Sequence, residues 1–316
     1  MEPVGELQLP ESRWADVGGP VHYREWAGPV DGPVFVCVHG LGGSNLNWAL
    51  VAPGLGRRGR VLAVDLAGFG LTPTAGRGSR VGANWRLLNG FLRALDLPQV
   101  VLVGNSMGGM ISMIQAAHSP ETVLAMVLVD TAFPRTSGLH GQFRPGTAAL
   151  FAVYNSRRLG ISVTRARARR FGAEGLVAEG LRISAADPTA IDPRLVELMV
   201  GLAKSRESFD YAAEAFVEAA QSIFQAQVKP AKYRALVRAI RRPALVIHGE
   251  LDQLVPVAAA AAAAAEHDNW KLVVFEGVGH IPQIEVPSRW LDVVHGWLED
   301  YLPAALRSSA SDSSMA

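Results

Sequence analysis

Hydrophobic and polar residues alternate along the chain in blocks that predict strands separated by helices. Near the start, Arg13–Val17 and Val21–Trp26 alternate polar with apolar residues around a Gly-Gly-Pro turn, as two paired strands do. The later runs are continuously apolar, which is typical of strands buried on both faces of a sheet. These runs are Val34–Val38, Val61–Asp65, Val100–Val103, Leu124–Val129, Ala244–His248 and Leu272–Phe275.

Helical spacing occurs between these runs. Asn84–Leu95 carries large apolar residues at helical intervals, and Asn45–Leu55 and Met110–Ala117 are further expected helices. Strands that alternate with helices imply right-handed crossovers and helices on both faces of a parallel sheet. We therefore predict an α/β fold with a mainly parallel, eight-stranded sheet flanked by helices.

The pattern changes between about Phe133 and Arg242, where strand-like runs are absent and helical segments alternate with glycine, proline and polar breaks. A helical block inserted between two strands is expected to cover the strand ends as a cap. The predicted organisation is a sheet core over 1–132, a helical cap over 133–242, the rest of the core over 243–302, and a small, polar, disordered tail over 303–316.

Composition supports a folded chain with a sizeable core. The 316 residues are 49% hydrophobic and 19% charged, which suits one large domain with an insertion and argues against general disorder. A formal net charge of +1 gives no electrostatic case for nucleic acid or a membrane surface as a partner. Cys37 is the only cysteine, which excludes an intramolecular disulfide and a cysteine-based zinc site.

No targeting segment is visible in the sequence. The acidic start, Met1–Glu6, lacks the basic and apolar regions of a secretory signal. The longest charge-free stretch, about Gln99–Ala117, is interrupted by glycines, Asn105 and Ser106, so we reject it as a membrane span. We expect a cytoplasmic protein, and the sequence leaves its oligomeric state open.

A Gly-x-Ser-x-Gly pentad lies between an apolar run and a helical segment. Ser106 at its centre is predicted to lie in a sharp strand-to-helix turn that holds its hydroxyl clear of the backbone. Gly104 and Gly108 remove side chains that would clash in such a turn. The following helix directs free N–H groups toward any negative charge that develops nearby. These features predict a nucleophilic serine.

Two later strand ends carry the side chains that such a serine requires. Asp252 follows the run Ala244–His248, and His280 follows the run Leu272–Phe275. Working residues gather beyond the carboxyl ends of parallel strands. A histidine accepts the proton of the serine, and a carboxylate fixes the tautomer of the histidine. The chain order Ser, Asp, His suits neighbouring strands.

Attack by the serine creates an oxyanion that needs N–H donors already in place. Met107, directly after the serine, is expected to provide one donor, and Leu41 in the glycine-rich segment after His39 the other. Asp130 ends the strand after the pentad and is an alternative to Asp252 as the third triad member.

Other polar residues at strand ends are interpreted as structural. His39 is expected to brace the glycine-rich loop and Asp65 its own loop, and His248, at a strand end, is also expected to be structural. The predicted cap carries an arginine cluster that suits either an anionic ligand or a solvated helix face, and apolar residues that suit either an acyl pocket or helix packing. These are Arg157, Arg158, Arg165, Arg167, Arg169 and Arg170, and Phe143, Leu150, Phe151, Tyr154 and Phe216.

These motifs together resemble the α/β-hydrolase fold with a helical cap, over roughly Val21 to Leu302. The resemblance implies that Ser106 is the nucleophile, His280 the general base and then acid, and Asp252 its orienting partner. It implies no metal and no organic cofactor. Trp48, Asn105 and Ile281 are the expected substrate contacts. The motifs that carry the resemblance are His39–Gly43, Asp65–Gly70, the pentad, Asp252, and Gly279-His280.

A serine at this turn favours acyl transfer, because the similar epoxide hydrolases and haloalkane dehalogenases use an aspartate there. Gly104–Gly109 also resembles the nucleophile turn of carbon–carbon hydrolases that act on meta-cleavage products. Those enzymes usually carry a tryptophan directly after the catalytic histidine, where this chain has Ile281. We expect hydrolysis of a small-molecule carboxylic ester first. The first alternative is carbon–carbon hydrolysis. Further alternatives are thioesterase, lactonase, amidase or perhydrolase activity and a non-catalytic ligand-binding role.

Overall fold

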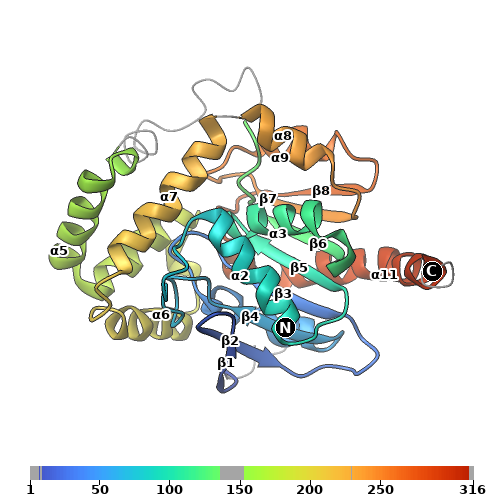
Figure 1. The fold of residues 1–316 in the computed structure, drawn as a ribbon, viewed down its shortest axis with the longest axis horizontal. Coiled ribbons are helices and arrows are strands. Elements are labelled where there is room, and N and C mark those ends of the chain that lie inside the picture. The colour runs from blue at the N-terminus through green and yellow to red at the C-terminus, as the bar shows by residue number, and fades with distance from the viewer. Residues whose placement is uncertain (1–6, 8, 136–152, 229, 313–316) are drawn as a thin grey trace.

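A computed structural model describes residues 7, 9–135, 153–228 and 230–312 of the chain. At the centre of this part lies an eight-stranded sheet with the order β1-β2-β4-β3-β5-β6-β7-β8 (Figure 1). The strands are β1 (Ser12–Asp16), β2 (Pro20–Trp26), β3 (Val34–Val38), β4 (Arg60–Val64), β5 (Val100–Asn105), β6 (Val123–Val129), β7 (Ala244–Gly249) and β8 (Trp270–Phe275).

The sheet is mainly parallel, as the sequence predicts. Strand β2 pairs antiparallel with β1 and with β4, whereas every pair from β4 through β3, β5, β6 and β7 to β8 is parallel. The carboxyl ends of β5, β6, β7 and β8 therefore meet at one edge of the sheet. Strand β5 lies in the interior of the sheet, so the residue that follows it is held between neighbours on both sides.

Two hydrophobic layers pack on the two faces of the sheet. In β3, Val36 and Val38 belong to one layer, whereas Phe35 and Cys37 belong to the other, because successive side chains of a strand point to opposite faces. One layer includes residues of α2 (Val81–Ala94), α3 (Met107–His118), α8 (Pro230–Arg238) and α9 (Val257–Ala264). The other includes residues of α1 (Ala52–Gly56) and α11 (Pro287–Asp312).

Helices α5 (Arg157–Ser184), α6 (Pro193–Ser205) and α7 (Ala212–Val228) lie to one side of the sheet, on the left of Figure 1. Helix α5 is kinked at Gly172, whose φ of 60° is one that glycine adopts at little cost. Helix α8 differs from these three, since its Tyr233 hydroxyl donates to the Ala132 carbonyl oxygen at 2.8 Å and its apolar residues join the α3 layer. Helix α8, the last helix of the predicted cap, therefore packs beside the sheet with the core helices.

Two segments differ from the elements predicted. The expected helix Asn45–Leu55 is split into a 3₁₀ turn over Asn45–Trp48 and α1, because Pro53 starts a new helix more readily than it continues one. Helix α11 runs on to Asp312, so residues 303–312 are helical where a disordered tail was expected. Pro303 is followed by Ala304, Ala305, Leu306 and Arg307, which are good helix formers. Within the described ranges, no helix is long and apolar enough to cross a membrane.

Candidate active site

Ser106 occupies a strained turn between β5 and α3, with φ 54° and ψ −113°. A non-glycine residue in such a conformation costs about 1–3 kcal/mol, which the surrounding packing must offset. The glycines of the pentad are required by close approach of the backbone. A Cβ added to Gly108 would lie 2.0 Å from the Val38 oxygen, and one added to Gly104 would lie 2.6 Å from the Gly109 nitrogen. The predicted strand-to-helix turn is therefore present.

The segments that carry the two predicted oxyanion donors lie next to the serine. Met107 is the first residue of α3, so its N–H has no acceptor within the helix. A Cβ added to Gly40 would lie 3.1 Å from the Ser106 Cβ, which places the backbone just before Leu41 against the serine. The structure thus brings the glycine-rich loop and the start of α3 together at Ser106.

His39 braces this loop, as predicted. Its Nδ1 donates to the Gly40 oxygen at 2.7 Å, and its Nε2 accepts the Leu66 N–H at 3.0 Å. An Nε2 that accepts a hydrogen bond carries no proton, so the ring is neutral. Burial lowers the pKa of His39, and the opposing charge of Asp65 does not reverse this. His39 therefore acts as a fixed link between two loops.

The structure pairs the predicted base with its predicted acid. His280 Nδ1 donates to Asp252 Oδ2 at 2.7 Å, while Asp252 Oδ1 accepts the N–H groups of Leu254 at 2.7 Å and Val255 at 3.0 Å. Burial opposes ionisation of Asp252, but the charges and hydrogen bonds of His280 and His248 outweigh it and lower the pKa of Asp252. Asp252 is therefore ionised, and Nε2 of His280 is left as the position that can accept a proton.

Asp130, the alternative acid, lies behind this pair. Its side chain is fully buried, and its Oδ1 accepts the Gly249 N–H at 2.9 Å. His248 Nε2 lies 3.3 Å from Asp252 Oδ2 and 3.6 Å from Asp130 Oδ1. Burial and the nearby charge of Asp252 raise the pKa of Asp130 well above its ordinary value. Asp252, and not Asp130, therefore accepts the hydrogen bond from His280.

Asp130, His248 and Asp252 are the group in the described residues whose atoms lie close enough to share a metal ion, all within 4.8 Å. The donor set does not suit a cation, because Asp252 Oδ2 is already hydrogen-bonded to His280 at 2.7 Å and the raised pKa of Asp130 favours its neutral form. We assign this cluster to the support of Asp252.

Replacing Asp130 with asparagine should flatten the pH dependence of stability. A carboxyl whose pKa is raised on folding stabilises the protein below its unfolded-state pKa, and that contribution is lost as the pH rises through the folded-state pKa. Asparagine cannot ionise, so Asp130→Asn should lose less free energy of unfolding than wild type between about pH 4 and about pH 8. Urea unfolding at both pH values measures this, with the exposed Asp31→Asn as control. Parallel curves for wild type and Asp130→Asn would contradict a neutral Asp130.

Asn105, one of the expected substrate contacts, makes hydrogen bonds within the protein. Its side chain is buried, and its Nδ2 donates to the Val129 oxygen at 3.2 Å and to the His280 oxygen at 3.1 Å. The amide therefore joins the end of β5 to the loop that carries the histidine. The position of Asn105 next to Ser106 in the sequence did not indicate the direction of its side chain.

The other two expected substrate contacts are also packing residues. Trp48 is fully buried in the sheet layer that contains α11, with its ring centroid 6.4 Å from that of Trp290. Ile281 is 5% exposed and packs in a cluster with Leu181 and Ala185 near the end of α5. A large apolar side chain near a motif can pack in the core as well as line a pocket, so a substrate contact at either residue stays a prediction.

Aromatic residues of the predicted cap reach the glycine-rich loop. Leu41 packs with Tyr154 and Phe216, whose rings meet edge to face at 5.4 Å between centroids. A Cβ added to Gly42 would lie 3.2 Å from Phe216 Cε2. These aromatic residues form an apolar wall against Leu41, whose N–H is one predicted oxyanion donor. Three further residues predicted for an acyl pocket, Phe143, Leu150 and Phe151, lie outside the described residues.

Carboxylates accompany part of the arginine cluster on α5. Arg165 pairs with Glu214 at 2.6 Å and Arg167 with Glu179 at 2.7 Å. The guanidinium of Arg170 lies 5.6 Å from the centre of the exposed Phe171 ring. This arrangement is that of a solvated helix face, which was one of the two interpretations of the cluster.

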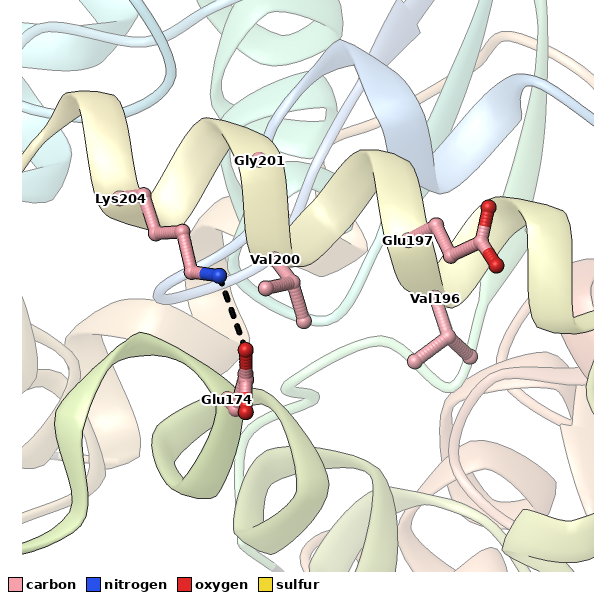
Figure 2. A pocket seen from close by; sticks show the side chains of 6 residues that line it. All are labelled: Glu174, Val196, Glu197, Val200, Gly201 and Lys204. Atoms are coloured by element: carbon pink, nitrogen blue, oxygen red, sulfur yellow. Dashed lines mark hydrogen bonds and ion pairs between the residues drawn. The ribbon is translucent and has the colours of Figure 1, made fainter.

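A pocket of about 410 Å³ lies on the cap between α5 and α6 (Figure 2). It is lined by Val196, Val200 and Gly201, and the ion pair of Lys204 with Glu174, at 2.8 Å, closes one side of it. No predicted site residue lines it. We therefore assign it no part in the chemistry at Ser106.

Comparison with known proteins shows the family of this chain. Residues 33–287 match the family described as alpha/beta hydrolase fold. The chain belongs to this family. A 2-hydroxymuconate semialdehyde hydrolase from Pseudomonas sp. strain CF600 is 31% identical to this α/β-hydrolase over 264 residues, which cover 82% of this chain and 83% of that protein. A 2-hydroxy-6-oxo-2,4-heptadienoate hydrolase from Pseudomonas putida F1 is 30% identical over 274 residues, covering 83% and 88%.

Solved structures share the fold of this α/β-hydrolase. A meta-cleavage product hydrolase from Pseudomonas fluorescens IP01 superposes with a TM-score of 0.68 at 23% identity, covering 93% of this chain and 99% of that one. At this level of identity the likeness concerns the fold.

Proposed function

We propose that this α/β-hydrolase is a serine hydrolase that cleaves a carbon–carbon bond beside a ketone in a conjugated dienoate of meta-cleavage type. The observation that carries the proposal is its 31% identity, over 82% of the chain, with a 2-hydroxymuconate semialdehyde hydrolase. The turn around Ser106 and the 2.7 Å pair of His280 with Asp252 supply the machinery that such a hydrolysis needs.

In the proposed first step, His280 Nε2 takes the proton of the Ser106 hydroxyl as its oxygen attacks the ketone carbon. The hydrogen bond from Nδ1 to Asp252 keeps Nε2 free for that proton and stabilises the cation that forms. The N–H groups of Leu41 and Met107 hold the oxyanion. One such donor is worth about 10²–10³ in rate.

Carbon–carbon and ester hydrolysis differ in the leaving group. In the 2-oxo tautomer of the substrate, the proton of the 2-hydroxyl group has moved to the carbon beside the ketone. Collapse of the oxyanion then breaks the bond to that carbon, and the electron pair passes through the enone to the 2-oxo oxygen as a dienolate. The cation of His280 returns a proton to that fragment. Water then hydrolyses the acyl group on Ser106 with His280 again as base. The sum is one water consumed, with one carboxylic acid and one protonated fragment released.

Ester hydrolysis, the first expectation from the sequence, becomes the second candidate. Two observations favour it. Ile281 stands where enzymes of the meta-cleavage type usually carry a tryptophan, and the wall of Tyr154 and Phe216 over Leu41 suits an apolar acyl chain. An alkoxide is also a far better leaving group than a carbanion, so the same residues would suffice for an ester.

A substrate panel separates the two candidates. Purified protein is assayed with a 2-hydroxy-6-oxo-2,4-dienoate and with nitrophenyl esters of increasing chain length, and Ser106→Ala serves as the blank. Turnover of the dienoate at a kcat/KM above that of every ester is expected. Ester turnover without dienoate turnover would replace the proposal with the second candidate. A protein that turns over neither and is not labelled by a fluorophosphonate would be the non-catalytic binding protein.

A further inference from the structure

Two consecutive N–H groups of the loop that carries His280 are bound by groups that connect it to the cap. The His280 N–H donates to the oxygen of Ser184, the last residue of α5, at 2.6 Å. The Gly279 N–H donates to the two carboxylate oxygens of Glu285, at 3.0 and 3.2 Å. The backbone on which the predicted base is mounted is therefore held partly from outside the sheet.

Glu285 makes a second connection to the cap. It lies on α10 (Pro282–Glu285), directly after the histidine loop, and its Oε2 also accepts the Ala186 N–H at 2.7 Å. One carboxylate therefore binds an N–H of the histidine loop and an N–H of the segment that follows α5. Hydrogen bonds to an ionised acceptor are roughly twice as strong as those between neutral groups.

The contact between the two segments is close as well as polar. A Cβ added to Gly279 would lie 2.5 Å from the Ser184 oxygen and 2.7 Å from the Ala186 nitrogen. On the opposite side, the side chain of Asn105 donates to the His280 oxygen at 3.1 Å. The histidine loop is thus held between the segment after α5 and the nucleophile turn.

We propose that Glu285 is a positioning residue, which sets His280 against Asp252 and Ser106 only while residues 184–186 of the cap are docked on the histidine loop. This inference rests on the proposed function and adds to it a coupling between the cap and the base. The physical reason is that a change of about 1 Å in the position of a catalytic group can cost about 10²-fold in rate. Nothing in the sequence indicated Glu285 except its place shortly after His280.

The test compares Glu285→Ala with Glu285→Gln and with a matched control. Glu250, which follows β7, accepts the Gly277 N–H of the histidine loop at 3.1 Å, so Glu250→Ala removes a carboxylate that binds this loop without touching the contact with the cap. The readouts are the rate of Ser106 labelling by a fluorophosphonate, kcat and KM on the best substrate of the panel, and amide hydrogen exchange. All are measured well below the unfolding midpoint of each variant.

Glu285→Ala is expected to label about 10- to 100-fold more slowly and to lose kcat in proportion, with KM within about twofold of wild type. Its amides at 184–186 and 279–281 should exchange faster together. Glu285→Gln keeps one acceptor oxygen and should stay within about threefold of wild type, and Glu250→Ala should match wild type.

Labelling of Glu285→Ala at the wild-type rate would overturn the inference, even with a lowered unfolding midpoint, because a purely structural role predicts that combination. An equal loss in Glu250→Ala would overturn it too. Wild-type protein that resists the fluorophosphonate would instead overturn the proposed function. In that case, unchanged exchange at 184–186 and 279–281 in Glu285→Ala would still reject the coupling, and faster exchange would support it.

Discussion

Ser106→Ala is expected to lower kcat by about 10⁴- to 10⁶-fold on whichever substrate of the panel the wild type turns over. The hydroxyl is the atom that bonds to the substrate carbonyl in the proposed mechanism, and alanine removes it while keeping the Cβ that packs beside Gly40. Single-turnover kinetics and loss of fluorophosphonate labelling measure the effect. Activity within tenfold of wild type would remove Ser106 from the mechanism.

The same position offers a stability control that separates chemistry from folding. Alanine retains a Cβ at φ 54°, so Ser106→Ala should unfold at nearly the wild-type temperature. Glycine relieves the strain of that conformation, so Ser106→Gly should be as inactive as alanine and more stable by about 1–3 kcal/mol. Calorimetry of wild type, Ser106→Ala and Ser106→Gly checks both statements. If both variants unfold at an equally lower temperature than wild type, the hydroxyl has a structural role.

Asp252→Asn should lower kcat by about 10⁴-fold without preventing folding. Its oxygen accepts the proton of His280 Nδ1 at 2.7 Å, and an amide nitrogen in that place would oppose the required tautomer and leave the histidine cation unpaired. The measurement is kcat at neutral pH, together with the rate of fluorophosphonate labelling.

Asp130→Asn is the matched control for that experiment. Asp130 is equally buried and lies beside the same histidine, His248, and its Oδ1 accepts the Gly249 N–H at 2.9 Å, a hydrogen bond that an asparagine oxygen can still accept. Its kcat should stay within about tenfold of wild type. If Asp130→Asn lowers kcat as much as Asp252→Asn does, both carboxyls are needed for catalysis. If Asp130→Asn lowers kcat more, Asp130 and not Asp252 is the acid of the triad.

The fold could be predicted because its evidence is local. Continuous apolar runs such as Val34–Val38 predict buried parallel strands wherever they occur, and the pentad around Ser106 predicts a turn from the glycines alone. The ends of helices were harder to predict. Pro53 divided one expected helix, and the last residues of α11 continued a helix, because helix ends depend on small differences in free energy that neighbouring contacts decide.

The direction of side chains could not be predicted in the same way. Trp48, Asn105 and Ile281 all adjoin motifs in the sequence, yet Trp48 packs near Trp290, Asn105 joins two loops, and Ile281 packs in a cluster with Leu181 of α5. Each of these contacts joins residues far apart in the chain. The distances between these residues depend on how the helical layers pack on the sheet, and the periodicity of hydrophobic residues in the sequence does not indicate this packing.

By itself, the sequence determined the order of strands and helices, the turn at Ser106, and the three strand ends from which a nucleophile, an acid and a base can meet, because backbone sterics and burial act over a few residues. The tertiary structure decided that Asp252 rather than Asp130 bonds to His280, and that the cap reaches the histidine through Ser184 and Glu285. Those choices depend on distances of about 3 Å between distant segments, and only the packed chain sets such distances.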